Sequence, residues 1–359
     1  MIVHVNDPIP FSRKRVMVAF RKQKRPTMRD VAELVGVSVQ TVSAVINNKS
    51  EITAETRLRV NEAIEKLGYR PYSVARSLRT GKTNTISFII SDIANPSFAA
   101  MASSAEDYAH ASGYHLMVHN THDDPQREAS YVHSVAERWI DGVLIVSAND
   151  GLESLRILQN AMLPVVAVER VPQEYSGPSV RFDNLRAGQL AAEYLLSLGH
   201  KRIAHISGPR HMRHVQERLS GFENTLLEAN IRVRPGWIVE GNWRCEDGYE
   251  CMLQILRSGD VPTALFASND RMAIGAIQAI SQAGLRVPDD ISVMGLDDIE
   301  VSAFQIPLLT TIRQPFTSLA TEAIQLLLKI IHGEHSPVPH RLLEPLLIER
   351  SSAAHYVER

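Results

Sequence analysis

The sequence predicts a chain of two unlike parts: a small all-α head that contains a helix-turn-helix, and a larger α/β body of two lobes, each with parallel sheets flanked by helices. Two short helical patterns on either side of Gly36 predict the head. From residue 84 onward, short apolar runs alternate with helical patterns, which predicts the body. An excess of basic residues near the start of the chain distinguishes the head from the body.

The first helix of the head has signals for both of its ends. Thr27 and Asp30 have the spacing of a capping box, in which the Thr27 hydroxyl accepts from backbone N–H groups. Gly36 follows where the chain must turn sharply, because glycine tolerates a positive φ. The apolar face of this helix is expected to consist of Val31, Leu34 and Val35.

The second helix of the head is predicted to present a polar surface. Ser38 is placed to cap this helix, and its inward positions are Val42, Val45 and Ile46. The outward side chains are mostly small or polar and can contact base edges and phosphates. They are Val39, Gln40, Thr41, Ser43, Ala44 and Asn47. A third helix is expected between Thr53 and Gly68, and a short one over 73–80.

The charge distribution points to a polyanionic partner for the head alone. The 359 residues have an ordinary globular composition, with 44% hydrophobic and 22% charged residues. The net charge of −2 hides an asymmetry, because residues 11–82 carry 16 Lys+Arg against 6 Asp+Glu and the remainder carries 22 against 34. A basic head on an acidic body is typical of a protein that binds nucleic acid through its head.

Several classes of protein are not indicated. No apolar run approaches the ~18 residues of a membrane span. Residues 1–26 lack the apolar core of a signal peptide, so we expect a disordered basic extension and a cytoplasmic protein. Cys245 and Cys251 are too few for a disulfide framework and have no metal-type partners. The sequence has no nucleophile elbow, no His-Glu-x-x-His and no complete glycine-rich nucleotide loop, so no enzyme, cofactor or metal is expected.

The body is predicted to contain two sheets. Strands are expected at 86–90, 116–118, 142–146, 165–168, 203–206, 264–267 and 291–294, with a last strand at 346–348. Helices are expected at 98–111, 126–138, 185–198, 216–228, 247–256, 271–282 and 317–331. These are too many units for one small domain, so two lobes would place strand ends on either side of a cleft, where ligands of open α/β sheets bind.

Several motifs, in their order and spacing, resemble the LacI/GalR (lactose-repressor) family of transcriptional regulators. They are Asp30-Val-Ala-x-x-x-Gly-Val-Ser, Thr41-Val-Ser-x-Val-Ile-Asn47, Leu67-Gly-Tyr-x-Pro71, Ala75-Arg-Ser-Leu78, Asp141-Gly-Val-Leu-Ile145, Ser268-Asn-Asp270-x-Met-Ala-x-Gly275 and Leu309-Thr-Thr-Ile312. The resemblance extends from Thr27 to about Arg350. It implies a homodimer that binds palindromic double-stranded operator DNA, with a core like that of periplasmic sugar-binding proteins.

The chain is accordingly divided into four parts. Residues 1–26 are the extension, 27–71 the helix-turn-helix domain, 72–83 the hinge helix and linker, and 84–359 the ligand-binding and dimerisation core. The first lobe of the core is expected to cover about 84–182 and 316–343. The second lobe is expected to cover about 183–315 and 344–359.

The resemblance assigns DNA-binding positions residue by residue. The base-reading positions fall on Val39 and Gln40, and a third falls on Ala44, whose methyl group can contact only a thymine methyl. Phosphate contacts are implied for Thr41, Ser43 and Asn47, and for Arg76 and Arg79 in the hinge. Leu78 matches the leucine that the family inserts into the minor groove, and Ala75 would let paired hinge helices approach. The alternatives are that Gln40 and Ser43 are merely solvated and that Leu78 is buried in the linker.

The resemblance also assigns a ligand site in the cleft. The implied positions are Ser91, Asn95, Phe98, Glu169, Arg218, Trp243, Asn269, Asp297, Gln314 and Phe316. An arginine, a carboxylate and an amide suit vicinal hydroxyls, so a sugar or sugar derivative is expected, with a nucleobase as the alternative.

Each assignment in the cleft has a competing interpretation. Arg218 and Asp297 could pair only with each other. Trp243 could be packing, and Asn269 could cap the helix that begins at Asp270. His211 and His214 are expected in a loop, where solvation is commoner than ligand contact. A solute-binding protein for transport shares the same core and remains a rival to the regulator, although the basic head argues against it.

Overall fold

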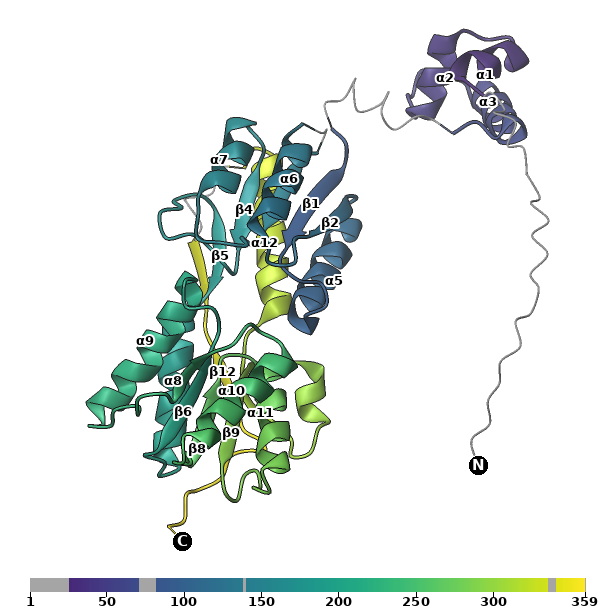
Figure 1. The fold of residues 1–359 in the computed structure, drawn as a ribbon. Helices are drawn as coiled ribbons and strands as arrows, with labels where there is room; N and C mark the ends of the chain where they lie inside the picture. The colour runs from purple at the N-terminus through teal and green to yellow at the C-terminus, as the bar shows by residue number, and fades with distance from the viewer. Residues whose placement is uncertain (1–25, 71–81, 138–139, 335–339, 359) are drawn as a thin grey trace, which may run out of the picture. The chain divides into compact units, whose positions relative to one another are not determined.

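The computed structural model describes residues 26–70, 82–137, 140–334 and 340–358. Contacts divide the chain into two compact units, Met1–Gly81 and Lys82–Arg359 (Figure 1). Within the described ranges, no helix combines the length and the apolar composition that a membrane crossing requires. The hinge positions predicted to contact DNA lie outside the described residues. They are Ala75, Arg76, Leu78 and Arg79.

The head consists of three helices around a small core. They are α1 (Met28–Val35), α2 (Val39–Ile46) and α3 (Ala54–Leu67). The capping box at Thr27 and Asp30 is present, and Gly36 ends α1 with φ of 72°. The buried hydrophobic core is Val31, Ala32, Val35, Val42, Val45, Val60, Ala63 and Tyr69.

One expected member of this core is exposed. Leu34 was expected on the apolar face of α1, but 47% of it is exposed, and Ala32 is buried instead. The reason is that α1 packs against both α2 and α3, so its buried face is turned toward positions 31, 32 and 35. The prediction for Leu34 was therefore wrong, while those for Val31 and Val35 are confirmed.

The first lobe of the second unit is a wholly parallel sheet of six strands in the order β11-β5-β4-β3-β1-β2. The strands are β1 (Thr85–Ile90), β2 (His115–Asn120), β3 (Gly142–Ile145), β4 (Val165–Val168), β5 (Ser179–Phe182) and β11 (His340–Leu343). The flanking helices are α5 (Pro96–Ala111), α6 (Pro125–Ala136), α7 (Glu153–Asn160) and α12 (Phe316–Ile331).

The second lobe has a six-stranded sheet in the order β12-β10-β9-β8-β6-β7, in which only β12 is antiparallel to its neighbour. The strands are β6 (Ile203–Ser207), β7 (Ile238–Glu240), β8 (Ala264–Ala267), β9 (Ser292–Asp297), β10 (Thr310–Arg313) and β12 (Leu346–Ile348). The helices are α8 (Asn184–Ser197), α9 (Arg213–Glu228), α10 (Cys245–Arg257) and α11 (Asp270–Gln282), with a 3₁₀ turn η1 (Glu300–Ala303).

Four strands and one helix were not among the expected elements. The strands are β5, β7, β10 and β11, and the helix is α7. Strand β7 has only three residues, and β11 is a largely exposed edge strand. Neither presents the run of buried apolar residues that identifies a strand in sequence. The expected strand at 346–348 and the seven expected helices are confirmed within a few residues.

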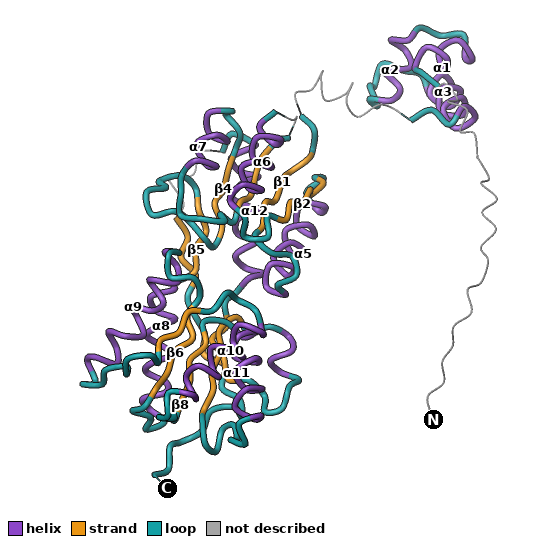
Figure 2. Tube along the Cα trace, viewed as in Figure 1, coloured by secondary structure: helices purple, strands orange, loops and turns teal. Residues whose placement is uncertain are grey.

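The chain passes between the two sheets three times, after β5, after β10 and after β11 (Figures 1 and 2). Residues at or just after the carboxyl ends of β4, β8, β9 and β10 lie together where the two lobes meet. In open α/β sheets this edge is where ligands bind. The fold thus brings residues that follow many different strands to one place.

A buried carboxylate supports the second lobe at this edge. Asp270 is fully buried and accepts hydrogen bonds from Thr311 Oγ1 at 2.5 Å, Ser302 Oγ at 2.7 Å and Ile299 N at 3.0 Å. Burial raises the pKa of Asp270 to about 6, although the three hydrogen bonds act in the opposite direction and lower it. The carboxylate therefore joins α11, η1 and β10.

The Asp270→Asn substitution is expected to lower the free energy of unfolding by ~1–3 kcal/mol at pH 7, because the amide N–H₂ cannot accept the bond from a neighbouring donor. The pKa of Asp270 is about 6 in the folded protein and about 3.9 in an unfolded chain. Its contribution to stability is therefore fully present below about pH 4 and is lost as the pH rises through about 6. The free energy of unfolding of the variant should therefore not fall in this way as the pH rises.

Urea denaturation between pH 4 and 7 measures both the loss of stability at pH 7 and its dependence on pH. Asp289→Asn, at an exposed side chain, is the control, and equal stability of the two variants would contradict the assignment.

Candidate functional site

The predicted DNA-reading surface is the exposed side of α2. Val39 is 43% exposed and Gln40 is exposed, whereas Val42 and Val45 are buried in the head. The other predicted positions on α2 and at its end are half-buried: Thr41, Ser43, Ala44 and Asn47. The structure thus places all six predicted positions of the head where at least part of each side chain is accessible.

Hydrogen bonds fix the two ends of α2. Ser38 Oγ accepts from Thr41 N at 3.0 Å and lies 2.9 Å from Thr41 Oγ1. At the other end, Asn47 Nδ2 donates to Ser43 O and, at 3.3 Å, to Ser43 Oγ. Three of the predicted phosphate-contacting side chains are therefore already oriented by bonds within the helix.

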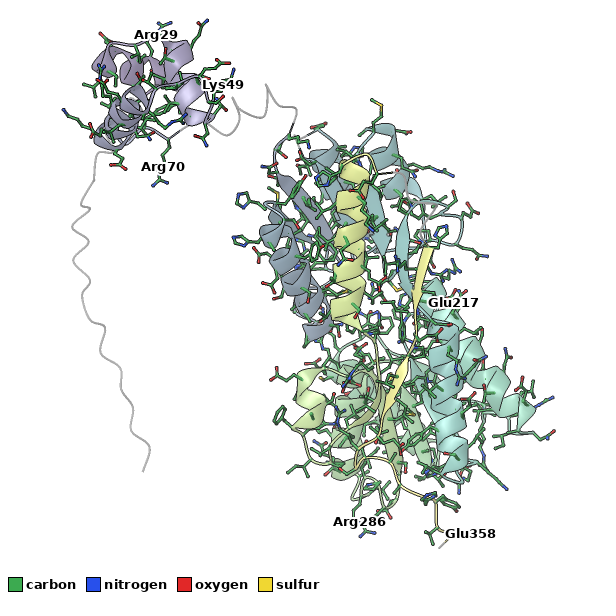
Figure 3. All side chains as sticks on the ribbon, turned by 180° about the vertical axis from the view of Figure 1, so that it is seen from behind. Arg29, Lys49, Arg70, Glu217, Arg286 and Glu358 are labelled. Carbon is green, nitrogen blue, oxygen red and sulfur yellow. The ribbon has the colours of Figure 1, made fainter. Side chains whose placement is uncertain are left out.

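The basic residues of the head have two roles. Arg57 donates to Asn48 Oδ1 at 2.6 Å and to Lys49 O at 2.7 Å, and Arg59 donates to Val35 O at 2.6 Å. These arginines tie α3 to the ends of α1 and α2. Arg29, Lys49 and Arg70 are exposed instead (Figure 3). Exposed cations on a small head suit contact with phosphates.

The second site is a small cavity between the lobes of the core. Its lining contains nine of the ten predicted ligand residues: Asn95, Phe98, Glu169, Arg218, Trp243, Asn269, Asp297, Gln314 and Phe316. Ser91 is not in the lining. It is fully buried behind the cavity, where its carbonyl oxygen accepts from Asp123 N at 3.0 Å. The cavity also contains three residues that were not predicted, Ser97, Arg170 and His214.

Most of these residues follow the carboxyl end of a strand. Glu169 and Arg170 come directly after β4, Asn269 comes two residues after β8, and Gln314 comes directly after β10. Asp297 is the last residue of β9. Because the lining residues leave separate strands of two sheets, the cavity depends on both lobes.

Several non-glycine residues at the cavity adopt a positive φ. The angle is 61° for Glu169, 71° for Trp243 and 127° for Asp297. The neighbouring His122 and Asp123 have φ of 57° and 58°. Such conformations are costly and cluster where the surrounding structure must aim a side chain. Backbone strain therefore marks the same place as the predicted residues.

Arg170 lines the cavity beside two aromatic rings. Its guanidinium carbon lies 5.2 Å from the centroid of the Phe98 ring and 5.7 Å from that of the Trp243 ring. Nη1 of Arg170 pairs with Asp123, and Nε lies 3.4 Å from Glu169 Oε2. A planar cation therefore lies between an aromatic ring of the first lobe and one of the second. The remaining cavity volume is about 30 Å³, about the share of one liquid water molecule.

Arg218 is held by neutral groups of the protein. It donates to Ser268 O and, at 2.6 Å, to Asn184 Oδ1. Arg218 and Asp297, both within the described ranges, form no ion pair within 4.0 Å, so the view that they pair only with each other is wrong. Arg218 Nε is buried and has no hydrogen-bond partner among the described residues. This donor is available to a bound molecule.

Burial shifts the pKa of the ionisable groups in the cavity. Burial raises the pKa of Asp297 well above its usual value, Asp270 raises it further, and Arg218 lowers it. Burial likewise raises the pKa of Glu169, although the positive charges of Arg170 and Arg218 lower it. The pKa of His214 is lowered well below its usual value by burial and then by Arg170. Clustered perturbed groups in a cleft are typical of a functional site.

The aromatic wall on the second-lobe side is built from Trp243 and His214. The His214 ring stacks on Trp243 with 5.7 Å between centroids and an interplanar angle of 16°. Gly208 makes room for this wall, since a Cβ there would lie 2.1 Å from the Trp243 ring. His214 was expected in a loop, but it lies in α9 and is buried. Contact of His214 with a ligand was considered from the sequence, but solvation was favoured.

Asn269 serves two purposes. Its Oδ1 accepts from Met272 N at 2.9 Å, which confirms the capping alternative, and its Nδ2 donates to Trp243 O at 3.0 Å. The same side chain therefore begins α11 and fixes Trp243 while lining the cavity. Arg170 was not predicted from the sequence, although it directly follows Glu169, which was.

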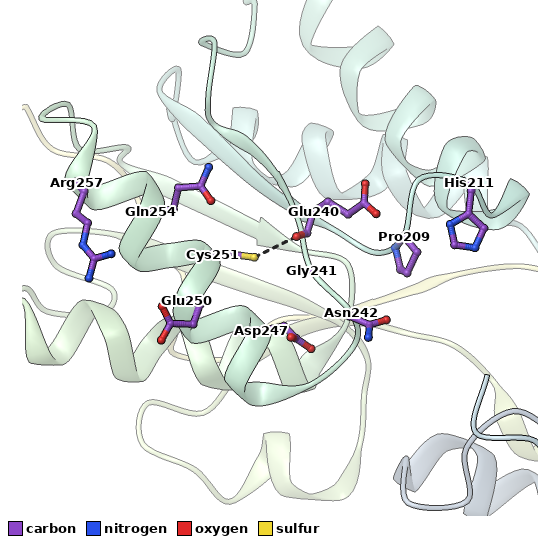
Figure 4. Close-up of a pocket in the computed structure, with 10 residues that line it drawn as sticks. All are labelled: Pro209, His211, Glu240, Gly241, Asn242, Asp247, Glu250, Cys251, Gln254 and Arg257. Carbon is purple, nitrogen blue, oxygen red and sulfur yellow. Dashed lines mark hydrogen bonds between the residues drawn. The ribbon is translucent and has the colours of Figure 1, made fainter. Parts of the chain in front are cut away.

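A larger groove of about 730 Å³ lies on the second lobe alone. Figure 4 shows it between the loop of Pro209 and His211, the end of β7 and the side of α10. Cys251 Sγ donates to Glu240 O at its base, at 3.5 Å. None of the ten predicted ligand residues lines this groove. No cluster of three His, Cys, Asp or Glu that could hold a metal ion occurs in the parts of the chain that the structure describes.

Comparison with known families supports the two-part organisation. Residues 27–72 match the family described as bacterial regulatory proteins, lacI family, and residues 192–353 match the periplasmic binding protein-like domain. The chain is 40% identical over 329 residues to the HTH-type transcriptional repressor PurR of Histophilus somni strain 129Pt. That alignment covers 91% of this chain and 98% of the relative. The PurR of Pasteurella multocida is 37% identical with the same coverage.

Solved structures show the same relationship. The lac repressor dimer bound to operator and the anti-inducer ONPF has 32% identity and a TM-score of 0.85, covering 92% of this chain and all of that chain. A complex of the transcriptional regulator CelR with cellobiose has 30% identity, the same coverage and a TM-score of 0.70. The fold is therefore that of a DNA-binding regulator with a two-lobed α/β core. The chain belongs to the lacI family of bacterial regulatory proteins.

The Ser38→Ala substitution is expected to weaken α2, because the cap for Thr41 N is lost at a cost of ~1 kcal/mol. In the full chain, hydrogen exchange of the α2 amides should accelerate about fivefold. Ser50→Ala removes a hydroxyl from the exposed turn that follows and is the matched control. Identical exchange rates in the two variants would show that the Ser38 cap does not stabilise α2.

Proposed function

We propose that this protein is a cytoplasmic transcriptional repressor whose affinity for operator DNA is controlled by a small ligand bound between the lobes of its core. The observation that carries the proposal is the cavity itself, where twelve residues from both lobes, nine of them predicted from the sequence, bring buried, polar and strained groups together. Val39, Gln40 and Ala44 of the head would contact base edges. Thr41, Ser43 and Asn47 would contact phosphates.

The shape of the cavity favours a flat ligand. The Arg170 guanidinium, itself flat, lies between the rings of Phe98 and Trp243, and Phe316 packs edge-on against Phe98 at 6.4 Å. A nucleobase could take the same place, stacked on aromatic rings and bonded at its edge. Similarity to repressors named PurR also favours a nucleobase. We therefore propose a nucleobase or a related heterocycle in place of the sugar that the sequence led us to expect.

A sugar remains the second candidate for a specific reason. Arg218, Asn269 and Asp297 place donors and acceptors around one wall with Trp243, an arrangement suited to hydroxyl groups. Two regulators of similar fold were solved with sugars: CelR with cellobiose, and a LacI family regulator from Enterococcus faecium with ribose, at 27% identity and a TM-score of 0.69. A transport role remains the less favoured alternative, because it would leave the basic head unexplained.

Ligand entry requires a rearrangement. With Arg170 in place the cavity holds about 30 Å³, so a ligand must displace this side chain or separate the lobes. Contacts across the cleft would change as a result, among them the bond from Arg213 N to Asp150 Oδ2 at 2.6 Å. A ligand that binds more tightly to one arrangement of the lobes increases the population of that arrangement and decreases that of the other. Coupling of ~1–3 kcal/mol between the ligand and operator would change either affinity about 5–150-fold.

An exposed apolar patch supports a homodimer. Four hydrophobic residues of η1 and the following loop are exposed, Val301, Phe304, Ile306 and Leu308, with Phe304 at 76% and Ile306 at 94%. Contiguous exposed apolar residues are typical of an interface with another protein chain. A dimer with two heads would read a two-fold symmetric operator.

The ligand assignment is tested by calorimetry of the full chain with nucleobases and monosaccharides. Asp297→Asn should weaken binding of the preferred compound about 10–100-fold, since a hydrogen bond to a charged or proton-donating carboxyl is lost. Asp289→Asn, the same change at an exposed position of the second lobe, should leave binding unchanged. Equal loss, or no loss, in both variants would place the ligand elsewhere.

The allosteric assignment is tested on a DNA site that the protein selects from a random pool. Affinity for this DNA, measured by fluorescence anisotropy, should change at least fivefold when the ligand is saturating. Affinity for the ligand should change by the same factor when the DNA is saturating. Ligand affinities that are identical with and without DNA would contradict control by the cleft.

The Phe304→Asp substitution is expected to convert a dimer into a monomer, because it places a charge in the proposed interface. Sedimentation equilibrium at micromolar concentration measures the mass. Met162→Asp introduces the same charge at a residue that is 89% exposed on the first lobe and should leave the dimer intact. A wild-type monomer, or a Phe304→Asp dimer, would contradict the interface.

A further inference from the structure

A second chamber adjoins the ligand cavity on its outer side. The two share four lining residues, Asn95, Phe98, Arg170 and Trp243. The outer chamber has a volume of about 60 Å³, and its rim includes the exposed residue Asn242. A molecule that fills the inner cavity could therefore extend into the outer chamber without crossing a wall of backbone.

The outer chamber carries an excess of positive charge. Its lining contains the arginines Arg170, Arg244 and Arg271 and two carboxylates, Asp92 and Asp123. Asp123 is bound to Arg170. Asp92 lies 3.8 Å from Arg271 and 4.0 Å from His122, so neither contact with Asp92 is a short ion pair. The inner cavity differs, because its two arginines face two carboxylates, Glu169 and Asp297.

Arg244 differs from Arg170 and Arg271 in that its guanidinium forms no ion pair with a carboxylate of the described residues. Among the residues that the structure describes, no carboxylate lies within 4.0 Å of its guanidinium. Arg244 is the N-cap of α10, and its backbone N–H donates to Asp247 Oδ2 at 3.1 Å. Arg271 is the second residue of α11. The positive ends of two helix dipoles also lie here, offset by Glu246 and Asp247 in the first turn of α10 and by Asp270 in that of α11.

A buried donor without a partner lies at the same place. Trp243 Nε1 is buried and donates to no partner among the described residues, and Trp243 lines both chambers. Buried donors are normally satisfied, by the protein or by something bound to it. The wall between the two chambers thus offers a hydrogen bond that the protein itself does not use.

We propose that the outer chamber binds an anionic group of the ligand, a phosphate ester or a carboxylate, while the planar part of the ligand lies between Phe98 and Trp243. This inference rests on the proposed ligand site of the cleft. Arg244 and Arg271 contact the anion, and Arg170, displaced from between the rings, exchanges Asp123 for the same anion. Arginine suits this exchange because its guanidinium binds carboxylate and phosphate in the same bidentate geometry.

The proposal is tested by calorimetry of the full chain with matched pairs of compounds. The pairs are adenosine and adenosine 5′-monophosphate, guanosine and guanosine 5′-monophosphate, ribose and ribose 5-phosphate, and uracil and orotate. We expect the anionic member of the preferred pair to bind at least tenfold tighter at low salt. This preference should fall as the salt concentration rises, because the rim of the chamber is exposed. Orotate distinguishes a carboxylate from a phosphate as the preferred anion.

Substitutions then locate the anion. Arg244→Gln and Arg271→Gln should each reduce the preference about tenfold while leaving the affinity for the neutral member within about twofold. Arg257→Gln makes the same change at the other, exposed end of α10, and should retain the full preference. If Arg244→Gln and Arg257→Gln change the preference for the anionic compound equally, the anion does not bind in the outer chamber.

The outcomes separate this inference from the proposed function. Neutral compounds that bind as tightly as their anionic partners would overturn the anion site and leave the cleft as the ligand site. Binding of no compound from any pair, with or without operator DNA, would overturn both. A preference that survives both Arg244→Gln and Arg271→Gln would overturn the placement of the anion.

Discussion

The core depends on bringing ionisable groups together out of contact with water. Glu169, Arg170, Arg218 and Asp297 are all buried at the edge where the strands of the two sheets end. Burial of a charge is costly unless it is paired or neutralised, and the raised pKa values of both carboxyls express that cost. Both lobes contribute to this cost, since Glu169 and Arg170 belong to the first lobe and Arg218 and Asp297 to the second. The relative placement of the lobes is therefore governed by electrostatics at the cleft as well as by apolar packing within each lobe.

The cleft also explains why the Arg170 guanidinium lies over two aromatic rings. A guanidinium that has lost most of its water is stabilised by aromatic faces and by a carboxylate, and Phe98, Trp243 and Asp123 supply them. The Arg170 side chain thereby fills a space in the cleft that suits a flat molecule. Any ligand that binds between the rings must displace the Arg170 side chain. Its measured affinity is therefore the difference between the free energy of its own contacts and that of the Arg170 contacts it replaces.

Much of the fold and of the candidate site could be predicted from the sequence, for different reasons. Helices α5 to α12, apart from α7, have apolar periodicity and were expected. Nine cavity residues followed from the resemblance to the LacI/GalR family. Arg170 and His214 could not be derived in this way, because their orientation depends on the positive φ of Glu169 and on the entry of α9. The exposure of Leu34 depends on how three helices of the head meet, which periodicity within one helix does not encode.

The three passages between the lobes have a consequence for how the protein is made. The first lobe needs α12 and β11, and the second needs β12, so neither lobe can be completed until the ribosome has translated almost the whole chain. The core of the head, by contrast, contains only residues before position 70. At the usual elongation rate of about 5–20 residues per second, the head precedes the finished core by roughly 15–55 s. During each round of synthesis a nascent chain thus contains every residue of the head's core before either lobe of the larger unit can be completed.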